Sequence, residues 1–512
     1  MEPINYQKEK ENIQYFAQQA RSFEAGELDR KDYKGISGKF GSYAQRGEGN
    51  MLRLRMPGGV MNLDKLGFVA DMVERFDIDR LKLTTCQTLQ LHNLSADETA
   101  YIMEAAMDHG IFTKGGGGDN PRNVMMSPLA GVLPGEYMDV RPWAMACGEY
   151  LLGRVDELHM PRKLKVAFSG GADNETHATF RDLGFVALPD GGFRVYCAGG
   201  LGPNPKLGVC VEEKAAPEDV LHYADAMIRV FTTHGNYTNR ARSRTRYLQD
   251  TLGVEGLQQA FRQALEESRA AADLCIHPAD MPIEKAADGT VSGARVIAQK
   301  QPGLYAVSYH PLGGNLPAGK PRQLHNLLAD MEQAEIRIAP GGTIYIVNLT
   351  GKEAEKILAA TADGANTLFE TSVSCIGASI CQHGVRDSQG LLQAMLQAVK
   401  PENFADGVLP RVRISGCPSS CGCHQVGEIG FVGGVKIIDK VPHPAFTVML
   451  GGDDHLGQET FGQNLGAMLE ESIPAFMVEL GKTIAAQNTT YAAWIGENRQ
   501  QLLQLAEKYI VK

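Results

Sequence analysis

The chain of 512 residues repeats its own pattern once, and this duplication constrains the fold more than any single motif. The segments MLRLRMPGGV (51–60) and LKLTTCQTLQLHNL (81–94) recur as LYAVSYHPLGGNL (304–316) and IRIAPGGTIYIVNL (336–349). A second pair of segments, at 160–171 and 409–422, is followed in both copies by Gly-Phe-Val. Two copies are too few for a solenoid, so we predict two similar halves of about 250 residues.

Hydrophobic periodicity predicts both strands and helices in each half. In the first block, residues 52–56 alternate as a strand, 64–76 follow a helical period, and 81–83 and 88–94 are strands. The second block mixes strands at 163–169 and 193–200 with a helix at 217–235. The predicted fold class is therefore α+β, or mixed α/β, with a pseudo-twofold relation between the copies.

The same patterns divide the chain into five segments. A polar, helical N-terminal arm at 1–45 lies outside the repeat, and the first half follows as blocks 46–115 and 116–276. The second half follows as 277–355, which opens with a linker at 277–292, and 356–512.

Composition and charge exclude several classes of protein. Lys and Arg number 50 against 60 Asp and Glu, a net charge of −10, whereas nucleic-acid binders usually carry the opposite balance. No apolar run reaches the ~18 residues of a membrane-spanning helix. The start, MEPINYQKEKENIQYF, lacks the apolar region of a signal peptide. We therefore expect a cytoplasmic protein with neither nucleic acid nor membrane as a partner.

The ten cysteines fall into two sets. A reducing cytoplasm disfavours disulfides, so single cysteines are expected to be buried core thiols. Six fit that description: Cys86, Cys147, Cys197, Cys210, Cys275 and Cys423. The other four form two pairs among Gly, Ser and Pro: Cys375, Cys381, Cys417 and Cys421.

The spacing within the second set points to a metal cofactor. Five, thirty-five and three residues separate successive cysteines, which differs from the two-residue spacing typical of zinc sites. Covalent haem attachment needs C-x-x-C-H, and Cys421-Gly-Cys423-His424 is one residue short. Four thiolates can hold a [4Fe–4S] cluster, for which spacing varies widely. Structural zinc and four buried core cysteines remain the alternatives.

The pattern C-x5-C followed by C-x3-C, with Pro-Ser-Ser inside the last pair, resembles the signature of the sirohaem sulfite and nitrite reductases. The resemblance covers most of the chain, including both PGG-type blocks and the PRKLK segment at 161–165. It implies ferredoxin-like half domains at 46–115 and within 277–355, a sirohaem-binding α/β domain at 116–276 and an iron–sulfur/sirohaem domain at 356–512. It also implies that the four clustered cysteines bind a [4Fe–4S] cluster, with Cys421 shared with the sirohaem iron.

The same resemblance implies a six-electron reduction of a small anion, which needs positive charge and proton donors around the substrate. Arg122, Lys163 and Lys165 match the substrate-facing cations of the family. One position departs from it, because Cys86 stands where the family carries an arginine. A thiol then replaces a permanent cation, so Cys86 is a candidate catalytic position with an altered role.

Sirohaem carries eight carboxylates, so further polar and cationic side chains should line its pocket. Surface exposure is the alternative explanation for each candidate. The candidates are Arg53, Arg55, Gln87, Gln90, His92, Arg242, Arg244 and Arg246. The glycine run at 115–118 is expected to form a flexible loop beside the haem.

No nucleotide-binding motif is present, so the electrons must come from another protein. A ferredoxin is the expected donor, and a separate flavoprotein subunit is the alternative. Lys165 favours sulfite, because nitrite enzymes often carry Asn at this position, whereas the Pro-Leu-Ala-Gly run at 128–131 resembles the nitrite enzymes. Reduction of sulfite to sulfide is the leading prediction. Nitrite reduction to ammonia, a corrin-ring hydroxylase and an iron–sulfur electron carrier without haem are the alternatives.

Overall fold

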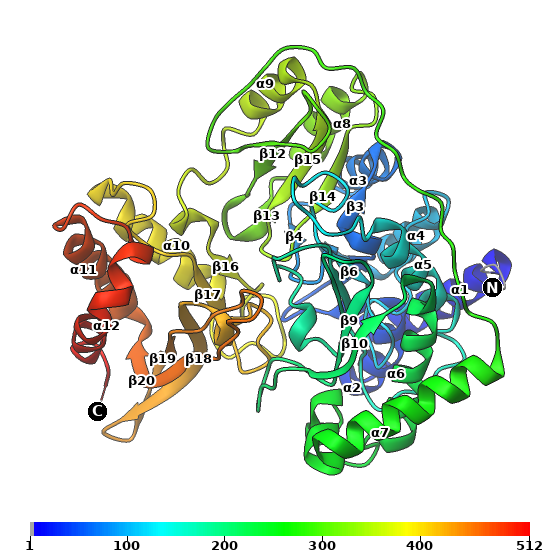
Figure 1. The fold of residues 1–512 in the computed structure, drawn as a ribbon. Coiled ribbons are helices and arrows are strands. Elements are labelled where there is room, and N and C mark those ends of the chain that lie inside the picture. The colour runs from blue at the N-terminus through cyan, green and yellow to red at the C-terminus, as the bar shows by residue number, and fades with distance from the viewer. Residues whose placement is uncertain (1–4, 512) are drawn as a thin grey trace.

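The computed structural model describes residues 5–511 and contains four five-stranded sheets covered by helices (Figure 1). Two of these sheets belong to each half of the chain, as the duplication predicts. The fold class is α+β, as predicted.

The N-terminal arm is helical and packs on the first half. It contains α1 (Tyr6–Glu24) and α2 (Arg30–Ser37), and Asn5 and Asp29 cap the two helix starts through side-chain oxygens. Phe16 and Tyr33 are fully buried, which anchors both helices in the core. The arm ends in β1 (Ser42–Ala44), which pairs with β2, so its last residues belong to the first sheet.

The two ferredoxin-like half domains share one core and exchange a strand. The first sheet has the order β1-β2-β5-β4-β13, and its counterpart has the order β11-β12-β15-β14-β3. The strand β3 (Val60–Met61) pairs with β14 of the second half, and β13 (Asn315–Leu316) pairs with β4 of the first. The two half domains are therefore interlocked through these short strands.

The remaining elements of the half domains correspond one to one. The first has β2 (Asn50–Leu54), α3 (Leu63–Arg75), β4 (Leu81–Leu83), β5 (Leu89–Leu94) and α4 (Ala96–Met107). The second has β11 (Val296–Ala298), β12 (Tyr305–Tyr309), α8 (Lys320–Leu328), β14 (Glu335–Ile338), β15 (Ile344–Leu349) and α9 (Gly351–Ala360). Ser95 and Thr350 form matching capping boxes at the starts of α4 and α9. The expected boundary at residue 355 lies inside α9, so this half domain extends to Ala360.

The two α/β domains also match in topology. The first has β6 (Met125–Met126), α5 (Arg141–Gly153), β7 (Val166–Ser169), β8 (Leu183–Ala187), β9 (Phe193–Cys197), β10 (Val209–Ala215), α6 (Val220–His234) and α7 (Leu248–Ala271). The second has β16 (Val373–Ser374), α10 (Ser388–Val399), β17 (Val412–Ser415), β18 (Ile429–Ile438), β19 (Val441–Leu450), β20 (Gln463–Leu469), α11 (Ile473–Ala485) and α12 (Tyr491–Glu507). In each, the first three strands pair in parallel and the last two are antiparallel.

The strand registers fix the equivalence of residues between the copies. Val166 pairs with Leu183 in the first domain, and Val412 pairs with Ile429 in the second. Between α7 and β11 the chain runs along the surface as an irregular segment that includes the linker expected at 277–292 (Figure 1).

The equivalent glycines Gly184 and Gly430 provide a test of this packing. A Cβ at either position would overlap a backbone carbonyl oxygen, that of Ala178 or that of His424. We therefore expect Gly184→Ala and Gly430→Ala each to lower the melting temperature, with a cost of about 1–3 kcal/mol or more from overpacking. Gly496→Ala is the matched control, because its Cβ would meet open space within α12. Wild-type melting of both buried variants would contradict the close approach.

Candidate active site

Two parallel strands bring the clustered cysteines together. Cys375 directly follows β16, and Cys417 lies two residues beyond the end of β17, its parallel neighbour. The carboxyl ends of parallel strands meet at one edge of a sheet, where ligands typically bind. The Gly416 N–H donates to Cys375 Sγ at 3.2 Å, and Ser388 Oγ lies 3.0 Å from the same sulfur. Cys375 and Cys417 thus lie at one edge of the sheet, where hydrogen bonds hold the Cys375 sulfur in place.

The four thiols influence one another electrostatically. Burial raises the pKa of Cys421, and the nearby Cys375 and Cys417 raise it further. The same two thiols add to the raised pKa of Cys381, for which burial is again the largest cause. All ten cysteines of the chain are free thiols.

The separation of these sulfurs disfavours a single zinc ion. Tetrahedral zinc with Zn–S bonds of about 2.3 Å places its sulfur ligands ~3.8 Å apart. Within residues 5–511, no three of the four clustered sulfurs lie within 4.8 Å of one another. Four thiols that share a site at wider spacing fit an inorganic cluster, in which each sulfur binds a different iron.

Close backbone packing shapes the loops that carry these cysteines. A Cβ on Gly416 would overlap the Arg386 carbonyl oxygen, and a Cβ on Gly422 would overlap that of Ile414. Gly377 has φ = 78°, and a Cβ there would also crowd Ser388. The glycines therefore allow the two loops to converge, as their position beside the cysteines suggests.

Positive side chains gather opposite Cys421. We call six residues the cation group, since the charge of each affects, or is affected by, another member or Cys86: Arg53, Arg122, Lys163, Lys165, Arg181 and Arg244. Burial lowers the pKa of Lys163 well below its usual value, and Arg244 and Lys165 lower it further, while the Cys421 thiol acts in the opposite sense. The Thr85 hydroxyl also donates to the Cys421 carbonyl at 3.0 Å. The cations and the cysteines therefore border one space.

Lys163 and Lys165 lie immediately before β7 and not within a regular strand. Leu164 between them forms a parallel bridge with Pro121, so the segment is extended but begins its ladder only at Val166. The strand expected at 163–169 is thus shorter than predicted.

The cation group has very little negative charge to balance it. Asp182, which accepts from Arg244 Nη2 at 3.0 Å, is the one carboxylate that hydrogen-bonds to the group in the described part of the chain. The buried Nε atoms of Arg122 and Arg244 lack hydrogen-bond partners among the described residues. Buried cations without counter-charges are costly, so this space is suited to anions. A polycarboxylate tetrapyrrole with a small anionic substrate fits that requirement.

Cys86 lies half-buried among these cations. Burial alone would raise its pKa, but Lys165 and Arg181, together with Arg53, outweigh that effect and lower the pKa to about 6. The surrounding cations therefore favour the thiolate form of Cys86, opposite in sign to the arginine that the family resemblance implies at this position.

Arginines also hold the glycine run at 115–118 in place. Arg122 Nη1 and Nη2 donate to the carbonyls of Gly116 and Gly118 at 2.6 and 2.7 Å, and Arg53 donates to Gly116 as well. Arg55 is buried and donates to the carbonyls of Lys114 and Arg122 at 3.0 and 3.2 Å. The loop that was expected to be flexible is therefore fixed by hydrogen bonds from arginines. Arg55 has a structural role, because it binds the backbone on both sides of the glycine run.

Several predicted cofactor contacts have structural roles. The Gln87 amide donates to the carbonyls of Met126 and Ile338 at 2.9 and 2.8 Å and accepts from Met126 N–H, so it joins the two halves and is corrected to a structural residue. Arg246 donates to the carbonyls of Leu201 and Pro203, which fixes the loop before β10.

The other weakly supported candidates also lie outside the cation group. Arg242 is exposed on the surface, as the alternative explanation anticipated. His92 is buried, and burial followed by Arg80 lowers its pKa to about 3, so it is neutral and cannot neutralise a carboxylate. Gln90, in β5, is buried. The structure places none of these three among the cations that face Cys421.

Two residues at the site were missed by the sequence analysis. Lys82 in β4 is buried behind the cysteines and donates to the Gly313 carbonyl; burial lowers its pKa to about 8, while Cys375 opposes that shift. Arg181 lies beside Cys86 and donates to the Thr176 carbonyl at 2.9 Å. The repeat offers a sequence signal for Lys82, because the equivalent position in the second copy, Arg337, is also a cation. In the structure Arg337 is fully buried.

The first copy contains a degenerate counterpart of the cysteine site. Ser127 is equivalent to Cys375 by strand register, and Gly170 N–H donates to Ser127 Oγ at 3.0 Å, as Gly416 does to the sulfur. Gly171 and Glu175 stand in the places of Cys417 and Cys421. The cavity there measures about 30 Å³, enough for a water molecule but not for a cluster.

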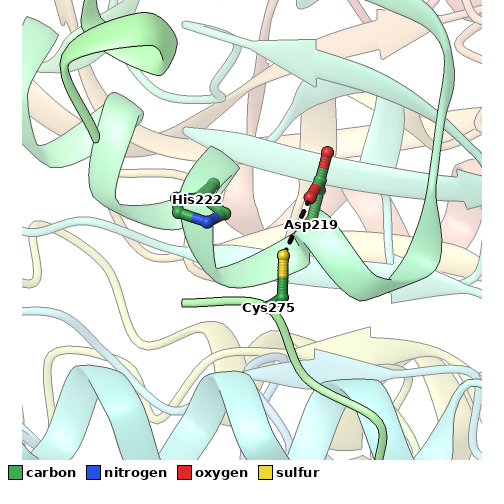
Figure 2. Close-up of side chains that lie close together, drawn as sticks. All are labelled: Asp219, His222 and Cys275. Atoms are coloured by element: carbon green, nitrogen blue, oxygen red, sulfur yellow. Dashed lines mark hydrogen bonds between the residues drawn. The ribbon is translucent and has the colours of Figure 1, made fainter. Parts of the chain in front are cut away.

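A separate group of potential metal ligands, Asp219, His222 and Cys275, lies where α6 meets the start of the linker (Figure 2). His222 Nε2 accepts from the Leu274 N–H at 3.3 Å, and Nδ1 lies 3.1 Å from Ser268 Oγ. Asp219 is also paired with an arginine of α7. Since these groups satisfy one another, the three residues fix the start of the linker.

Comparison with known proteins agrees with this geometry. The model of the nitrite/sulfite reductase ferredoxin-like half domain matches residues 43–109, and that of the nitrite and sulphite reductase 4Fe-4S domain matches residues 117–269. Both matches fall on the first copy, whereas the four clustered cysteines lie in the second.

Full-length relatives extend the similarity across both copies. The chain is 30% identical to ferredoxin–nitrite reductase of Synechococcus elongatus, covering 80% of this chain and 82% of the relative. It is 25% identical to a sulfite reductase [ferredoxin] of Mycolicibacterium paratuberculosis, covering 86% and 82%. The structure of the NirA protein of Mycobacterium tuberculosis superposes with a TM-score of 0.79 over 96% of both chains at 23% identity, which supports the fold.

The chain belongs to the nitrite and sulfite reductase family. It is an oxidoreductase of the class whose cofactors are sirohaem and a [4Fe–4S] cluster, which confirms the predicted family and cofactor pair. Among the helices of residues 5–511, none combines the length and apolar character needed to cross a bilayer.

The charge environment of Cys86 yields a direct test. In cofactor-free protein, iodoacetamide should alkylate Cys86 at a rate that rises through pH 6, because the thiolate is the reactive form. Lys165→Ala should move this midpoint upward toward the ordinary thiol value. Exposed Cys275, whose pKa is raised, should react only in alkaline solution and serves as the internal reference. Peptide mass spectrometry resolves the sites, and a wild-type midpoint above pH 8 would show that the cations do not surround Cys86.

Proposed function

We propose that this enzyme reduces nitrite to ammonia in six electrons, with sulfite as a second and poorer substrate. The observation that carries the proposal is the poorly balanced cation group that faces Cys421, with a thiol at position 86. The group supplies the positive charge that a small anion requires, but less of it than an arginine at position 86 would provide.

The residues present fit both cofactors of the family. Cys375, Cys381, Cys417 and Cys421 would hold the cluster, and Cys421, which faces the cations, would be the ligand shared with the sirohaem iron. When bound, the coupled pair supplies single electrons at an open iron position. Arg53, Arg122 and Arg244 would neutralise carboxylates of the macrocycle.

The lysines have the properties of anion binders and proton donors. Burial, with Arg244 and Lys165, lowers the pKa of Lys163, so a bound oxyanion would favour its ammonium form, which can donate a proton as oxygen leaves as water. Lys165 lies beside Cys86 and lowers the pKa of that thiol, so the two side chains place a positive charge and an acidic thiol next to each other. Both side chains thus serve a reaction that consumes protons as well as electrons.

The charge at position 86 favours the substrate with less negative charge. Sulfite is a dianion and nitrite is a monoanion, so a nearby thiolate penalises sulfite more. The named relatives support this order, because several nitrite reductases match the chain. Sulfite remains the second candidate, since Lys165 retains a cation where nitrite enzymes often have Asn and a sulfite reductase is also a relative.

A ferredoxin is the proposed electron donor, and the cytoplasm is the proposed compartment. The relatives of both substrate types are named as ferredoxin enzymes. The direct test of function measures nitrite and sulfite reduction side by side with reduced methyl viologen. Turnover of neither anion, in protein whose visible spectrum shows sirohaem, would overturn the proposal; a spectrum without haem would favour the electron-carrier alternative.

The cluster assignment predicts specific losses of iron. Cys375→Ser, Cys381→Ser and Cys417→Ser should each lose most iron, and most sirohaem with it, because the two cofactors share one wall. Cys275→Ser, at the exposed start of the linker, should retain both. Iron analysis and the visible spectrum provide the readout, and normal iron in all three site variants would reject the assignment.

Substrate preference should respond to Lys165. In a Cys86→Ser background, where position 86 cannot change its charge, Lys165→Asn removes one cation, so the ratio of kcat/KM for nitrite to that for sulfite should rise about tenfold, or ~1.4 kcal/mol. Exposed Lys356, on α9, provides the matched control as Lys356→Asn, which should leave the ratio unchanged. An unchanged ratio in Lys165→Asn would place Lys165 away from the substrate.

A further inference from the structure

A β-hairpin projects from the cysteine-bearing domain beyond the rest of its sheet (Figure 1). Strands β18 and β19 pair along their whole length, but β17 accompanies β18 only as far as Val432, and β20 accompanies β19 only from Ala445. Asp439 and Lys440 form the tip with φ of 48° and 66°, values typical of a tight hairpin turn. Residues 433–444 therefore extend outward without a neighbouring strand on either side among the described residues.

One face of this hairpin is apolar and exposed. Ile437 is 68% exposed and Val435 is 49% exposed, and they are directly opposite Pro442 and Pro444 on β19. Opposed residues of antiparallel strands, and residues two apart on a strand, project to the same face. We call these four residues the hairpin face.

The hairpin begins directly on the loop that carries the cysteines. A Cβ on Gly433 would lie 2.7 Å from Arg386 Cβ, so the strand packs against the loop without a gap. An open pocket of about 790 Å³ continues from Pro444 to Ala378 and Val385 of the same loop. Val385 is 39% exposed, which extends the apolar surface toward Cys381.

Two cations contact this loop, and one of them, Arg46, also lines the pocket that reaches Pro444. Lys34 Nζ lies 2.7 Å from His383 Nε2, and Arg46 Nη2 donates to the Gly384 carbonyl at 2.9 Å. Both cations are exposed, although the chain as a whole has a net charge of −10. Asp387, Glu470 and Glu471 line the far part of the same pocket, so an acidic partner is favoured only at the edge of the loop where Lys34 and Arg46 lie.

The form of the surface favours a transient partner. Stable interfaces use roughly 20–30 residues on each side, whereas electron-transfer encounters are smaller. The hairpin face with Val385 offers five apolar residues, too few for a stable dimer. Pro442 and Pro444 lack backbone N–H groups, which blocks addition of another strand along β19 and favours contact through the face.

We propose that the hairpin face and the adjoining loop of Cys381 form the docking surface for a small acidic redox protein that delivers electrons to the cluster. This inference rests on the proposed function. The apolar face supplies contact area, the basic edge orients the partner, and the loop between them brings the partner to a cluster ligand.

The test compares a protein donor with a small-molecule donor in the cofactor-loaded enzyme. Val435→Asp combined with Ile437→Asp should lower kcat/KM for a reduced plant-type ferredoxin at least tenfold while leaving methyl viologen-driven turnover unchanged. Val254→Asp is the matched control, because Val254 is 53% exposed on α7 in the other half. It should alter neither activity.

Other outcomes separate the hypotheses. Unchanged ferredoxin turnover in the double variant would overturn the docking surface, as would a wild-type enzyme that accepts electrons from viologen but not from ferredoxin. Gel filtration that shows a wild-type dimer and a monomeric double variant would also overturn it, by identifying the face as a self-association surface. Failure of the wild type with both donors and both anions would instead reject the proposed function.

Discussion

Concentrated positive charge between the two halves is the constraint on which the site depends. Arginines and lysines from five separate segments converge there, with Asp182, bound to Arg244, as the carboxylate among them. Such an arrangement is costly in an empty protein and favourable around a polyanion, because anion binding supplies the missing counter-charge. The fold is therefore organised around a ligand that carries many negative groups.

Duplication supplies the framework, and divergence makes the site unique. The same strand register places Ser127 and Cys375 at equivalent edges, each receiving a hydrogen bond from the following strand's glycine. One copy has kept thiols while the other has Ser, Gly and Glu in a small cavity. The exchange of β3 and β13 ties the half domains together, so each half contributes to the single site.

The sequence was sufficient for the fold class, the duplication and the cysteine set, because each depends on periodicity or spacing. It failed where a role depends on contacts across the duplication. Gln87 joins the two halves through backbone carbonyls, and Lys82 lies behind Cys375, although neither has a local pattern that reveals this. Strands of two residues, such as β3 and β13, carry no periodicity, so their exchange could not be predicted. The sign of charge at Cys86 likewise depends on neighbours distant in sequence.

In the proposed reaction, the arrangement would also keep the electron donor apart from the anion that its electrons reduce. In this reaction, protons and the anion would reach the side of Cys421 on which Lys163 and Lys165 act. Electrons would enter on the opposite flank, at the surface loop of Cys381, where apolar and basic groups meet. A cluster held between these two cysteines would conduct electrons inward while the protein keeps the donor away from the anion.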